Sequence, residues 1–453
     1  MPTYDTIIIG AGYAGLSATT TLVAAGKKVL LLEARPRVGG RAWTIHHADG
    51  TYEDAGASFL GPQHTRMLTL AAGHGIKTFK IPTKGNTVFY HRGQRKEYSG
   101  FLPPLSPLAK LDAFLAIRKF EGLAGTVDLE KPWETPKAAE WDLVTLREWL
   151  GSACWTSEAR ESINVAVEGI WCVDASQFSL LHASWLSKAG VSFTVLSSVE
   201  GGAQEQLITG GGQAVAEKMA QRLGSEVVRL DEAVMEVDQA GVEEVVVTTA
   251  KGRYTCRTVV IAIPPPLILN LRFTPRLPGQ RVQMLQHMPM ATNWKVYATY
   301  PKPMWRGNGL RGDVVSPGSY LSLMYDASPE DQSRGVLMGF IYAAKAIAFA
   351  EMDEESRRKV VLEEIVRYFG DEAGKPSRLS MYTMMDEEWS TGCPVAVPAP
   401  GVWTMFRDWM RKPIDRVHWA GTEMATSWSG YMEGAVQSGE RAAGEVLGVL
   451  GGK

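Results

Sequence analysis

Residues 6–15 read Thr-Ile-Ile-Ile-Gly-Ala-Gly-Tyr-Ala-Gly, and residues 29–33 read Val-Leu-Leu-Leu-Glu. The first four residues of each stretch are apolar or β-branched, which is typical of a fully buried strand in a parallel sheet. A helical pattern connects the two stretches and ends at Gly26, the expected C-cap. Together they predict a strand–helix–strand unit with the motif G-x-G-x-x-G at its first turn.

Each glycine of this motif has an expected physical task. Gly10 makes the tight turn, Gly12 lets the backbone approach a pyrophosphate, and Gly15 lets the helix pack closely on the strand. The N-terminus of the helix offers free N–H groups and the positive end of its dipole to the phosphates. Glu33, 23 residues after Gly10, is placed to accept the hydroxyls of a ribose. The register of these features predicts a dinucleotide site rather than a purely structural turn.

The residues after Glu33 separate the two common dinucleotides. Glu33 suits the adenosine ribose of either NAD or FAD, so it does not decide between them. Residues 35–42 read Arg-Pro-Arg-Val-Gly-Gly-Arg-Ala, which directs a glycine pair and Arg41 back towards the phosphates. Arg41 could neutralise a diphosphate with its bidentate fork. This extension resembles that of the glutathione-reductase-like flavoproteins, in their amine oxidase branch.

Length and composition bound the class of protein. The chain has 453 residues, of which 45% are hydrophobic and 21% charged, close to an ordinary globular average. Disordered, collagen-like and disulfide-scaffold classes are excluded on this basis. The net charge of −2 gives no electrostatic footprint for nucleic acid or for an anionic membrane surface.

The cysteines and the apolar segments indicate a compartment. Four scattered cysteines, without a C-x-x-C pair or an accompanying histidine pair, indicate neither a zinc site nor a dithiol redox site. Such thiols suit a reducing compartment. We see no signal peptide, no apolar run long enough for a membrane span and no C-terminal membrane anchor. We therefore expect a soluble, cytoplasmic protein without a bound metal.

The rest of the chain alternates between two kinds of segment. Residues 80–206 combine Pro-rich loops with Trp-rich helical stretches and predict a mostly helical layer of a second domain. Strand-like runs within residues 227–263 would complete the nucleotide-binding domain. Three further runs, Lys295–Tyr300, Tyr320–Tyr325 and Val336–Tyr342, predict a second sheet, and residues 354–369 predict an amphipathic helix. The small residues of 56–62 could let the backbone lie against a flat ring, or form an ordinary turn.

Residues 417–434 contain a second strand-to-helix junction, in which Gly421-Thr422-Glu423 follows a short strand and a helix begins near Met432. With this segment the chain resembles a flavin-containing monoamine oxidase over essentially its whole length. The segments that carry the resemblance are 6–41, Ile261–Pro265, Met288–Lys295, Trp389–Cys393 and Gly421–Gly434.

The resemblance implies an α/β fold, α+β overall, with two interleaved domains. An FAD-binding, Rossmann-like domain of glutathione-reductase type would comprise residues 1–79, 207–287 and 390–453. A substrate domain of mixed sheet and helices would comprise residues 80–206 and 288–389. Motif and resemblance together assign the cofactor contacts to Gly10, Gly12, Tyr13, Ala14, Gly15, Glu33, Ala34, Arg35, Gly40, Arg41, Ala42, Gly56, Ala57, Ser58, Val234, Cys393, Gly421, Thr422 and Met432.

Three residues have roles implied by the resemblance. Cys393 corresponds to the cysteine that some family members link to the flavin 8α carbon, although relatives with non-covalent FAD leave a free thiol as the alternative. Lys295 would hold a water against the flavin and assist its reaction with oxygen, the alternative being a surface lysine. Tyr431 would form one wall of an aromatic cage beside the flavin, where an electron-rich ring face suits an amine.

The sequence also departs from the family pattern. Pro394 stands where the second wall of the cage is expected, and Met384 stands where mitochondrial relatives have a tryptophan. Trp389 could supply part of the missing aromatic surface, so we place it with Lys295 and Tyr431 among the catalytic residues. The substrate pocket is assigned to Trp171, Cys172, Leu196 and Pro394, the first three of which could equally be core.

The function implied is FAD-dependent oxidative deamination of an amine to an imine, with oxygen reduced to hydrogen peroxide. A monoamine substrate is favoured, and a polyamine, an amino acid or an alkaloid intermediate is the alternative. A polyamine site would require acidic residues along the channel, such as Glu200 or Glu205. A non-catalytic protein like the Rab GDP-dissociation inhibitors is a third hypothesis. The expected partners are an amine and oxygen, with no nucleic acid, and a homodimer stays open.

Overall fold

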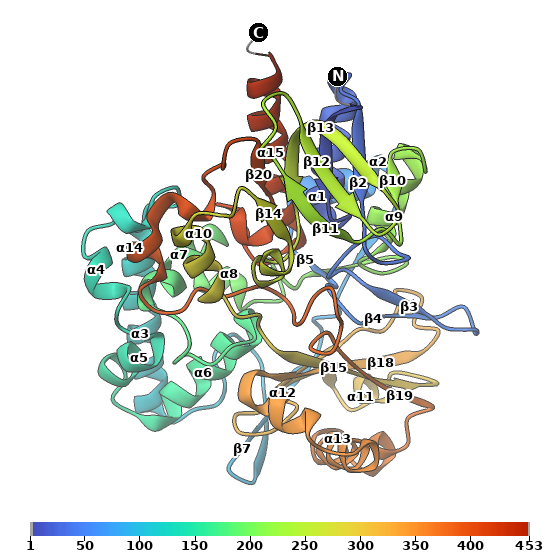
Figure 1. Ribbon diagram of the computed structural model, residues 1–453. Coiled ribbons are helices and arrows are strands. Elements are labelled where there is room, and N and C mark those ends of the chain that lie inside the picture. The colour runs from blue at the N-terminus through green and yellow to red at the C-terminus, as the bar shows by residue number, and fades with distance from the viewer. Residues whose placement is uncertain (1–2, 452–453) are drawn as a thin grey trace.

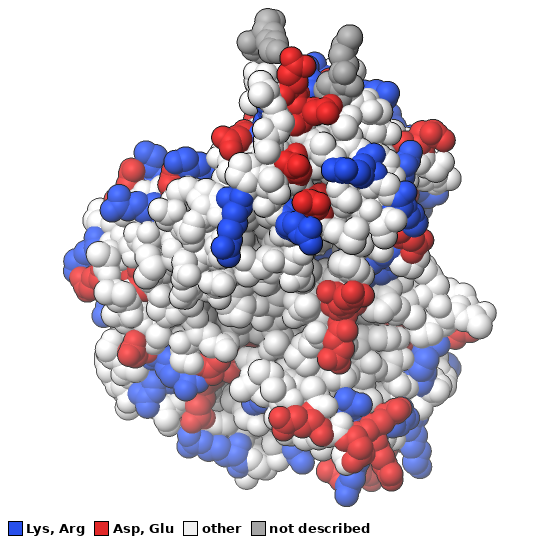
Figure 2. Space-filling view, in the orientation of Figure 1, with Lys and Arg blue, Asp and Glu red and all other residues white. Residues whose placement is uncertain are grey.

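The computed structural model of the chain describes residues 3–451 (Figure 1). Its strands form two large sheets, and its helices lie around and between them. The α/β architecture predicted from the sequence is confirmed. On the face shown in Figure 2, the acidic and basic side chains of the described residues are interspersed.

The first large sheet contains the N-terminal motif. Its strands follow the order β10-β2-β1-β13-β12-β11-β14, and β20 also pairs with β13. The pairs around β1 are parallel, whereas β12 pairs antiparallel with β13 and β11. The bounds are β1 Tyr4–Ile9, β2 Val29–Leu32, β10 Val228–Arg229, β11 Val234–Asp238, β12 Val245–Thr249, β13 Arg253–Ile261, β14 Arg272–Thr274 and β20 Val417–Trp419.

Helix α1 (Tyr13–Ala24) covers this sheet and packs beside the C-terminal helix α15 (Met432–Gly451), so that the two ends of the chain lie close together (Figure 1). Their shared core includes Leu16, Leu22 and Val436, all nearly inaccessible to solvent. Burial of these apolar side chains stabilises the pairing by about 25 cal/mol per Å² removed from water. The last helix therefore completes the domain that the first helix begins.

The second large sheet follows the order β19-β15-β18-β17-β16-β7-β8. Helices α12 (Ala343–Ala350) and α13 (Glu354–Phe369) pack against one face, with Phe349, Val361 and Ile365 in the shared core. The bounds are β7 Asn86–His91, β8 Gln94–Tyr98, β15 Asn293–Tyr300, β16 Leu310–Val315, β17 Leu323–Asp326, β18 Gly335–Tyr342 and β19 Arg378–Thr383.

The remaining elements are short strands and a helical layer. The short strands form two small sheets. Strand β3 pairs with β4, and a three-stranded sheet has the order β5-β9-β6. Their bounds are β3 Thr44–His46, β4 Tyr52–Asp54, β5 Phe59–Leu60, β6 Thr78–Lys80 and β9 Gln206–Ile208. The other helices are α2 Thr65–Gly73, α3 Pro107–Gly125, α4 Ala138–Trp141, α5 Leu146–Ala153, α6 Ser157–Trp171, α7 Leu180–Ala189, α8 Phe193–Leu196, α9 Ala214–Leu223, α10 Gly279–Gln286, α11 Met304–Gly307 and α14 Val402–Phe406.

The arrangement departs from expectation in one segment. Residues 80–206 do contain six helices, α3 to α8, but the hairpin β7–β8 extends the second sheet instead of joining a helical layer. Every strand of the first large sheet falls within 1–79, 207–287 or 390–453, and every strand of the second within 80–206 or 288–389. These domain boundaries stay our proposal.

Candidate active site

A cavity of about 390 Å³ opens at the carboxyl ends of β1 and β2, where a parallel sheet places its ligand sites. The glycines of the first turn shape its floor. Gly10 has φ +100°, and a Cβ on it would lie 2.8 Å from the carbonyl oxygen of Ala262. A Cβ on Gly15 would lie only 1.9 Å from the carbonyl oxygen of Gly10, so the predicted close packing of helix on strand is confirmed.

The N-terminus of α1 faces this cavity without a compensating side chain. Gly12 is its N-cap, makes no side-chain capping hydrogen bond, and is followed by no acidic residue in the first turn. Gly12, Tyr13 and Ala14 line the cavity. The unpaired N–H groups and the helix dipole therefore offer a site to an anion such as a diphosphate.

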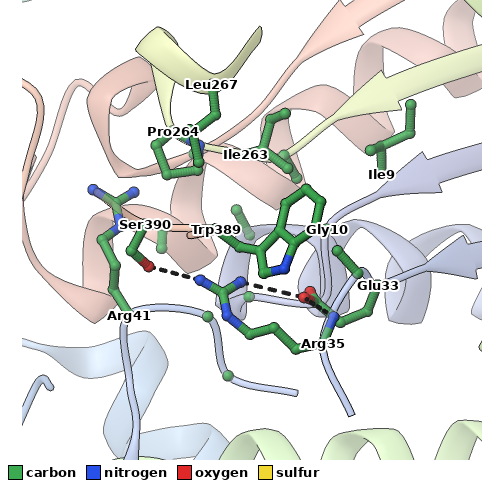
Figure 3. Close-up of a pocket in the computed structure, with 18 of the residues that line it drawn as sticks. Ile9, Gly10, Glu33, Arg35, Arg41, Ile263, Pro264, Leu267, Trp389 and Ser390 are labelled. Carbon is green, nitrogen blue, oxygen red and sulfur yellow. Dashed lines mark hydrogen bonds and ion pairs between the residues drawn. The ribbon is translucent and has the colours of Figure 1, made fainter. Parts of the chain in front are cut away.

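Glu33 is buried at the end of β2 and holds two turns together (Figure 3). Its Oε2 accepts a hydrogen bond of 2.7 Å from the backbone of Ala11, and its Oε1 accepts one of 3.1 Å from the backbone of Arg35. The Arg35 guanidinium lies 3.2 Å from the same Oε1. The carboxyl oxygens of Glu33 line the cavity and keep further acceptor capacity for ribose hydroxyls.

Arg35 extends from this point to a segment far along the chain. It donates to the carboxylate of Glu387 and, at 2.7 Å, to the hydroxyl of Ser390. Figure 3 shows the indole of Trp389 next to this contact, beside Gly10 and near Ile263. Trp389 lines the cavity at the Glu33 end, and the described aromatic contacts of Tyr431 do not include it. Its suggested role as a second wall beside Tyr431 gains no support from this placement.

Arg41 lines the cavity but its fork is already engaged. One terminal nitrogen donates to Pro394 at 2.8 Å and to Glu423 at 2.6 Å, and the other donates to Glu423 at 3.1 Å. Because the buried Glu423 carboxylate matches the charge of Arg41, phosphate binding would rest mainly on the helix N-terminus. The prediction that Arg41 neutralises a diphosphate stays a prediction.

Cys393 and Pro394 both line the cavity, as do Tyr431 and Met432. The Cys393 thiol is free and buried, and its backbone N–H donates to Ala291 at 3.0 Å. Burial raises the pKa of this thiol, although the positive charges of Arg41 and Lys295 act in the opposite direction. A sulfur held in place beside a cavity is available to a ligand there.

Lys295 lies on β15 and is only 4% exposed, so the alternative of a surface lysine is excluded. Its Nζ donates to the carbonyl oxygen of Gly56 at 2.6 Å and to the hydroxyl of Ser58 at 2.5 Å. Burial lowers its pKa to about 8, against the opposing influence of Asp54. Lys295 therefore holds the backbone of Gly56 and the side chain of Ser58, on either side of Ala57, which itself lines the cavity.

Tyr431 is packed against aromatic partners that the sequence analysis did not identify. Its ring centroid lies 5.3 Å from Trp428 and 5.4 Å from His64, both edge-on. His64 accepts a hydrogen bond of 3.0 Å at Nδ1 from the backbone of Gly61, and burial lowers its pKa to about 3. His64 is therefore neutral and positions Tyr431 and Trp428. Trp428 lies within the segment 417–434 of the second strand-to-helix junction, but no local pattern distinguishes it from a core tryptophan.

A second cavity has a volume of about 490 Å³ and an aromatic wall that includes Tyr325. Leu196 lines it, and its place in a substrate pocket stays a prediction, whereas Trp171 packs edge-on against Phe178 at 5.3 Å and lines neither of these two cavities. Tyr325 also lines the second cavity, and its ring lies 6.0 Å from that of Phe340. Lys295 Nζ in turn lies 5.5 Å from the Phe340 centroid. Contacts through Phe340 and Tyr325 therefore link Lys295 to the second cavity.

Cys172 ends α6 with φ +57° and is buried among groups that include Cys393 and Lys295, which act on its pKa. Most other predicted cofactor contacts do line the first cavity, whereas Gly15, Gly56 and Ser58 are not among its lining residues. Those lining it are Gly10, Gly12, Tyr13, Ala14, Glu33, Ala34, Arg35, Gly40, Arg41, Ala42, Ala57, Val234, Cys393, Gly421, Thr422 and Met432. Ile263, Pro264 and Leu267 also line it and were not predicted (Figure 3).

The residues present fit FAD. A buried carboxylate and the Val234 side chain suit the adenosine half, and unpaired helix N–H groups suit the diphosphate. Small residues at 56–58 and an aromatic ring at Tyr431 suit a flat ring system. Within residues 3–451 no group of three His, Cys, Asp or Glu side chains could hold a metal ion, and no helix is long and apolar enough to cross a membrane.

Comparison with known proteins finds amine oxidases. Residues 13–447 match the family model of flavin-containing amine oxidoreductases. The chain is 35% identical over 452 residues to the flavin-containing amine oxidase A of Equus caballus, covering 99% of this chain and 86% of the relative. The cyclohexylamine oxidase structure from Brevibacterium oxydans superposes with a TM-score of 0.95 at 30% identity, over 99% and 100% of the two chains. A putrescine oxidase structure with bound putrescine has the same TM-score at 30% identity, over 98% and 99%.

Proposed function

The chain belongs to the family of flavin-containing amine oxidoreductases, and from this premise we propose that it oxidises a monoamine to an imine with oxygen as the final acceptor. FAD-dependent oxidation of an amine is the reaction of this enzyme. The proposal adds that the substrate has one amine, that the imine hydrolyses to an aldehyde or ketone, and that oxygen takes up the two electrons and is reduced to hydrogen peroxide.

When bound, FAD supplies the acceptor for the hydrogen and electron pair lost from the α-carbon of the amine and for their transfer to oxygen. The protein must present the amine in its uncharged form, because only the neutral nitrogen has a lone pair to assist this loss. The aromatic surroundings of Tyr431 and Phe340 disfavour an ammonium that has lost its water. Tyr431 would contact the amine through its ring face, in an orientation maintained by Trp428 and His64.

Lys295 serves the half-reaction with oxygen in this proposal. Its pKa near 8 keeps much of its population positively charged at neutral pH, and two protein oxygens hold the ammonium in place. A fixed positive charge in a water-poor site stabilises negative charge that develops on oxygen. The placement of Lys295 behind Ala57 supports this role because Ala57 lines the cofactor cavity.

We further propose that Cys393 carries the cofactor through a thioether. The position of the free thiol in the cavity wall, next to Pro394 and in the same lining as Tyr431, supports this proposal. It is the residue on which the family resemblance and the cavity geometry agree most directly. A soluble enzyme that acts in the cytoplasm and a homodimeric assembly are parts of the same proposal.

The alternative of a polyamine substrate depended on two acidic residues. Glu205 is paired with Lys80 at 2.9 Å and accepts from the backbone of Gly201, so it is committed to the protein. Glu200 does line the second cavity. Asp313 also lines it but lies 2.8 Å from the guanidinium of Arg311. One carboxylate without such a partner on the wall is weak support for a polycation, and the monoamine stays the favoured substrate.

The observation that carries the proposal is the shared cavity of the dinucleotide motif, Cys393 and Tyr431. The test is to record the visible spectrum of the purified protein and its bleaching by amines without oxygen. Peroxide release is then measured across aryl-alkyl, aliphatic, poly- and amino-acid amines. A yellow protein that releases peroxide with monoamines supports the proposal, whereas a colourless protein or one that no amine bleaches contradicts it.

A further inference from the structure

The second cavity has a polar corner that the amine oxidation does not use. Most of its wall is apolar, with Phe101, Ile170, Phe193 and Leu196 among its lining residues. The strands β7, β8 and β16 contribute a different kind of wall. That part of the sheet carries Thr87, Tyr98, Arg311 and Asp313, all of which line the cavity.

The strand register brings these four residues together. On β16 a Cβ on Gly312 would lie 2.9 Å from Trp305 Nε1, so that this position faces the core, while Arg311 and Asp313 on either side line the cavity. Val314 pairs with Val88 in the parallel register, and the irregular stretch of β16 at 311–313 lies opposite Thr87. Thr87 pairs in turn with Tyr98 on β8.

Two buried oxygens in this corner have no hydrogen-bond partner among the described residues. Asp313 is 4% exposed, and its Oδ2 lies 2.8 Å from the Nε of Arg311, but its Oδ1 accepts nothing from residues 3–451. Thr87 is 1% exposed, and its Oγ1 also has no hydrogen-bond partner within residues 3–451. Buried polar atoms are rarely left unpaired, because losing water without replacement is costly. A ligand that enters this cavity with a matching donor recovers that cost.

The charges in the cavity decide which donor fits. Arg311, Asp313 and Glu200 are the charged side chains that line it. Arg311 already neutralises Asp313, so a second ammonium at Oδ1 would lie next to a guanidinium and would bring an uncompensated charge into an apolar space. A carboxylate on the ligand would be repelled by the carboxylates of Asp313 and Glu200. A neutral hydroxyl donates one hydrogen bond to Oδ1 and accepts one from Thr87 without burying net charge.

We propose that Asp313 and Thr87 form a subsite for a hydroxyl group at the far end of the amine substrate. The inference rests on the proposed function, because it requires the amine end to react near Tyr431 while the rest of the molecule passes Tyr325 into the second cavity. Burial raises the pKa of Asp313 to about 7. Burial disfavours the charged form of this group, so a hydroxyl donor to Oδ1 would stabilise the ionised form that pairs with Arg311.

The experiment compares amines that differ only by a hydroxyl. The holoenzyme is assayed with n-alkylamines of four to eight carbons, with the corresponding ω-amino alcohols and α,ω-diamines, and separately with phenethylamine and tyramine. We expect the hydroxyl to raise kcat/KM by about tenfold or more at one chain length or on the aromatic ring, as expected for one buried hydrogen bond. The aliphatic and aromatic pairs distinguish an amino alcohol from a phenol as the source of the hydroxyl.

Variants test whether this ratio comes from the polar corner. Asp313→Asn keeps the volume and should lower the hydroxyl-to-hydrogen ratio, Asp313→Val should bring it close to one, and Thr87→Val should lower it independently. Asp331→Asn makes the same chemical change in an exposed loop and should leave the ratio unchanged. Flavin content and the thermal midpoint are measured for each variant. If Asp313→Val does not fold, the other two variants decide.

The outcomes separate this inference from the proposed function. If the enzyme oxidises plain and hydroxylated amines equally well, or if the Asp313 and Thr87 variants keep the preference, the subsite is wrong while the amine oxidation stands. A diamine preferred over the matched amino alcohol would also overturn it, because the corner would then accept an ammonium. If the holoenzyme oxidises none of these amines, it is the proposed function that fails.

Discussion

Lys295 and Ser58 are 237 residues apart in the sequence, yet a hydrogen bond of 2.5 Å joins the Nζ of one to the Oγ of the other. The contact connects the second large sheet with the segment behind the cofactor cavity. Since the lysine is buried, it costs free energy to keep it protonated, and this cost depends on pH.

We expect Lys295→Met to change the pH dependence of stability. The pKa of Lys295 is about 8 in the folded protein and near its ordinary value of 10.5 in the unfolded chain. Between these values the unfolded chain binds more protons, so the stability of the wild type rises with pH in this window. The rise relative to Lys295→Met should reach about 3 kcal/mol. Denaturant unfolding from pH 7 to pH 10.5 measures it, and parallel curves for the two proteins would contradict it.

The same substitution should affect the two half-reactions unequally. Loss of the fixed ammonium should slow reoxidation of the reduced enzyme by oxygen by about tenfold or more, since one electrostatic contact of this kind contributes a few kcal/mol to a transition state. Reduction by the amine should change much less. Stopped-flow absorbance measures each half-reaction separately. Equal slowing of both would indicate a general distortion of the site.

Cys393→Ala should release the cofactor from the chain. The wild type, precipitated with acid and unfolded, should stay yellow and carry the mass of FAD, whereas the variant should lose all colour to the supernatant. Cys172→Ala is the matched control, because Cys172 is also a buried free thiol but does not line the first cavity. Release of all flavin from the wild type would show that Cys393 is only a packing residue.

The Tyr431 ring, rather than its hydroxyl, should matter for the amine. Tyr431→Phe keeps the edge contacts with His64 and Trp428 and should retain kcat/KM within about threefold. Tyr431→Leu removes the aromatic face that would contact the neutral amine and should lower kcat/KM by about tenfold, within the range of a specific aromatic contact. Flavin content serves as the control for folding. A larger loss in Tyr431→Phe than in Tyr431→Leu would assign the role to the hydroxyl.

The parts of the molecule that were predictable from the sequence are local. The strand–helix–strand unit and the helix at 354–369 follow from periodicity and glycine placement, and the structure has both. Strand β16 was not predicted, because Gly312 with φ +89° interrupts its alternation and its register is irregular. It becomes a strand by pairing with β7, more than 200 residues earlier in the chain.

The site shows the same division. The lining residues of the first turn were identified because their spacing is fixed by one contiguous motif. The edge-on contacts of His64 and Trp428 with Tyr431 join segments that no local pattern relates. Asp313 was also missed, since its significance lies in an unpaired oxygen that only the packing of three strands reveals.

The contact of Arg41 with Glu423 has a consequence for biosynthesis. It connects the first cofactor motif with the last across 382 positions, and α15 covers the apolar side of α1. A ribosome-bound chain that has not yet released its final segment therefore has neither a closed cofactor cavity nor a shielded first helix. Cofactor capture is accordingly a late event in the life of the chain, and removal of residues 421–451, which contain Glu423 and α15, should yield an apoprotein prone to aggregate rather than a weaker enzyme.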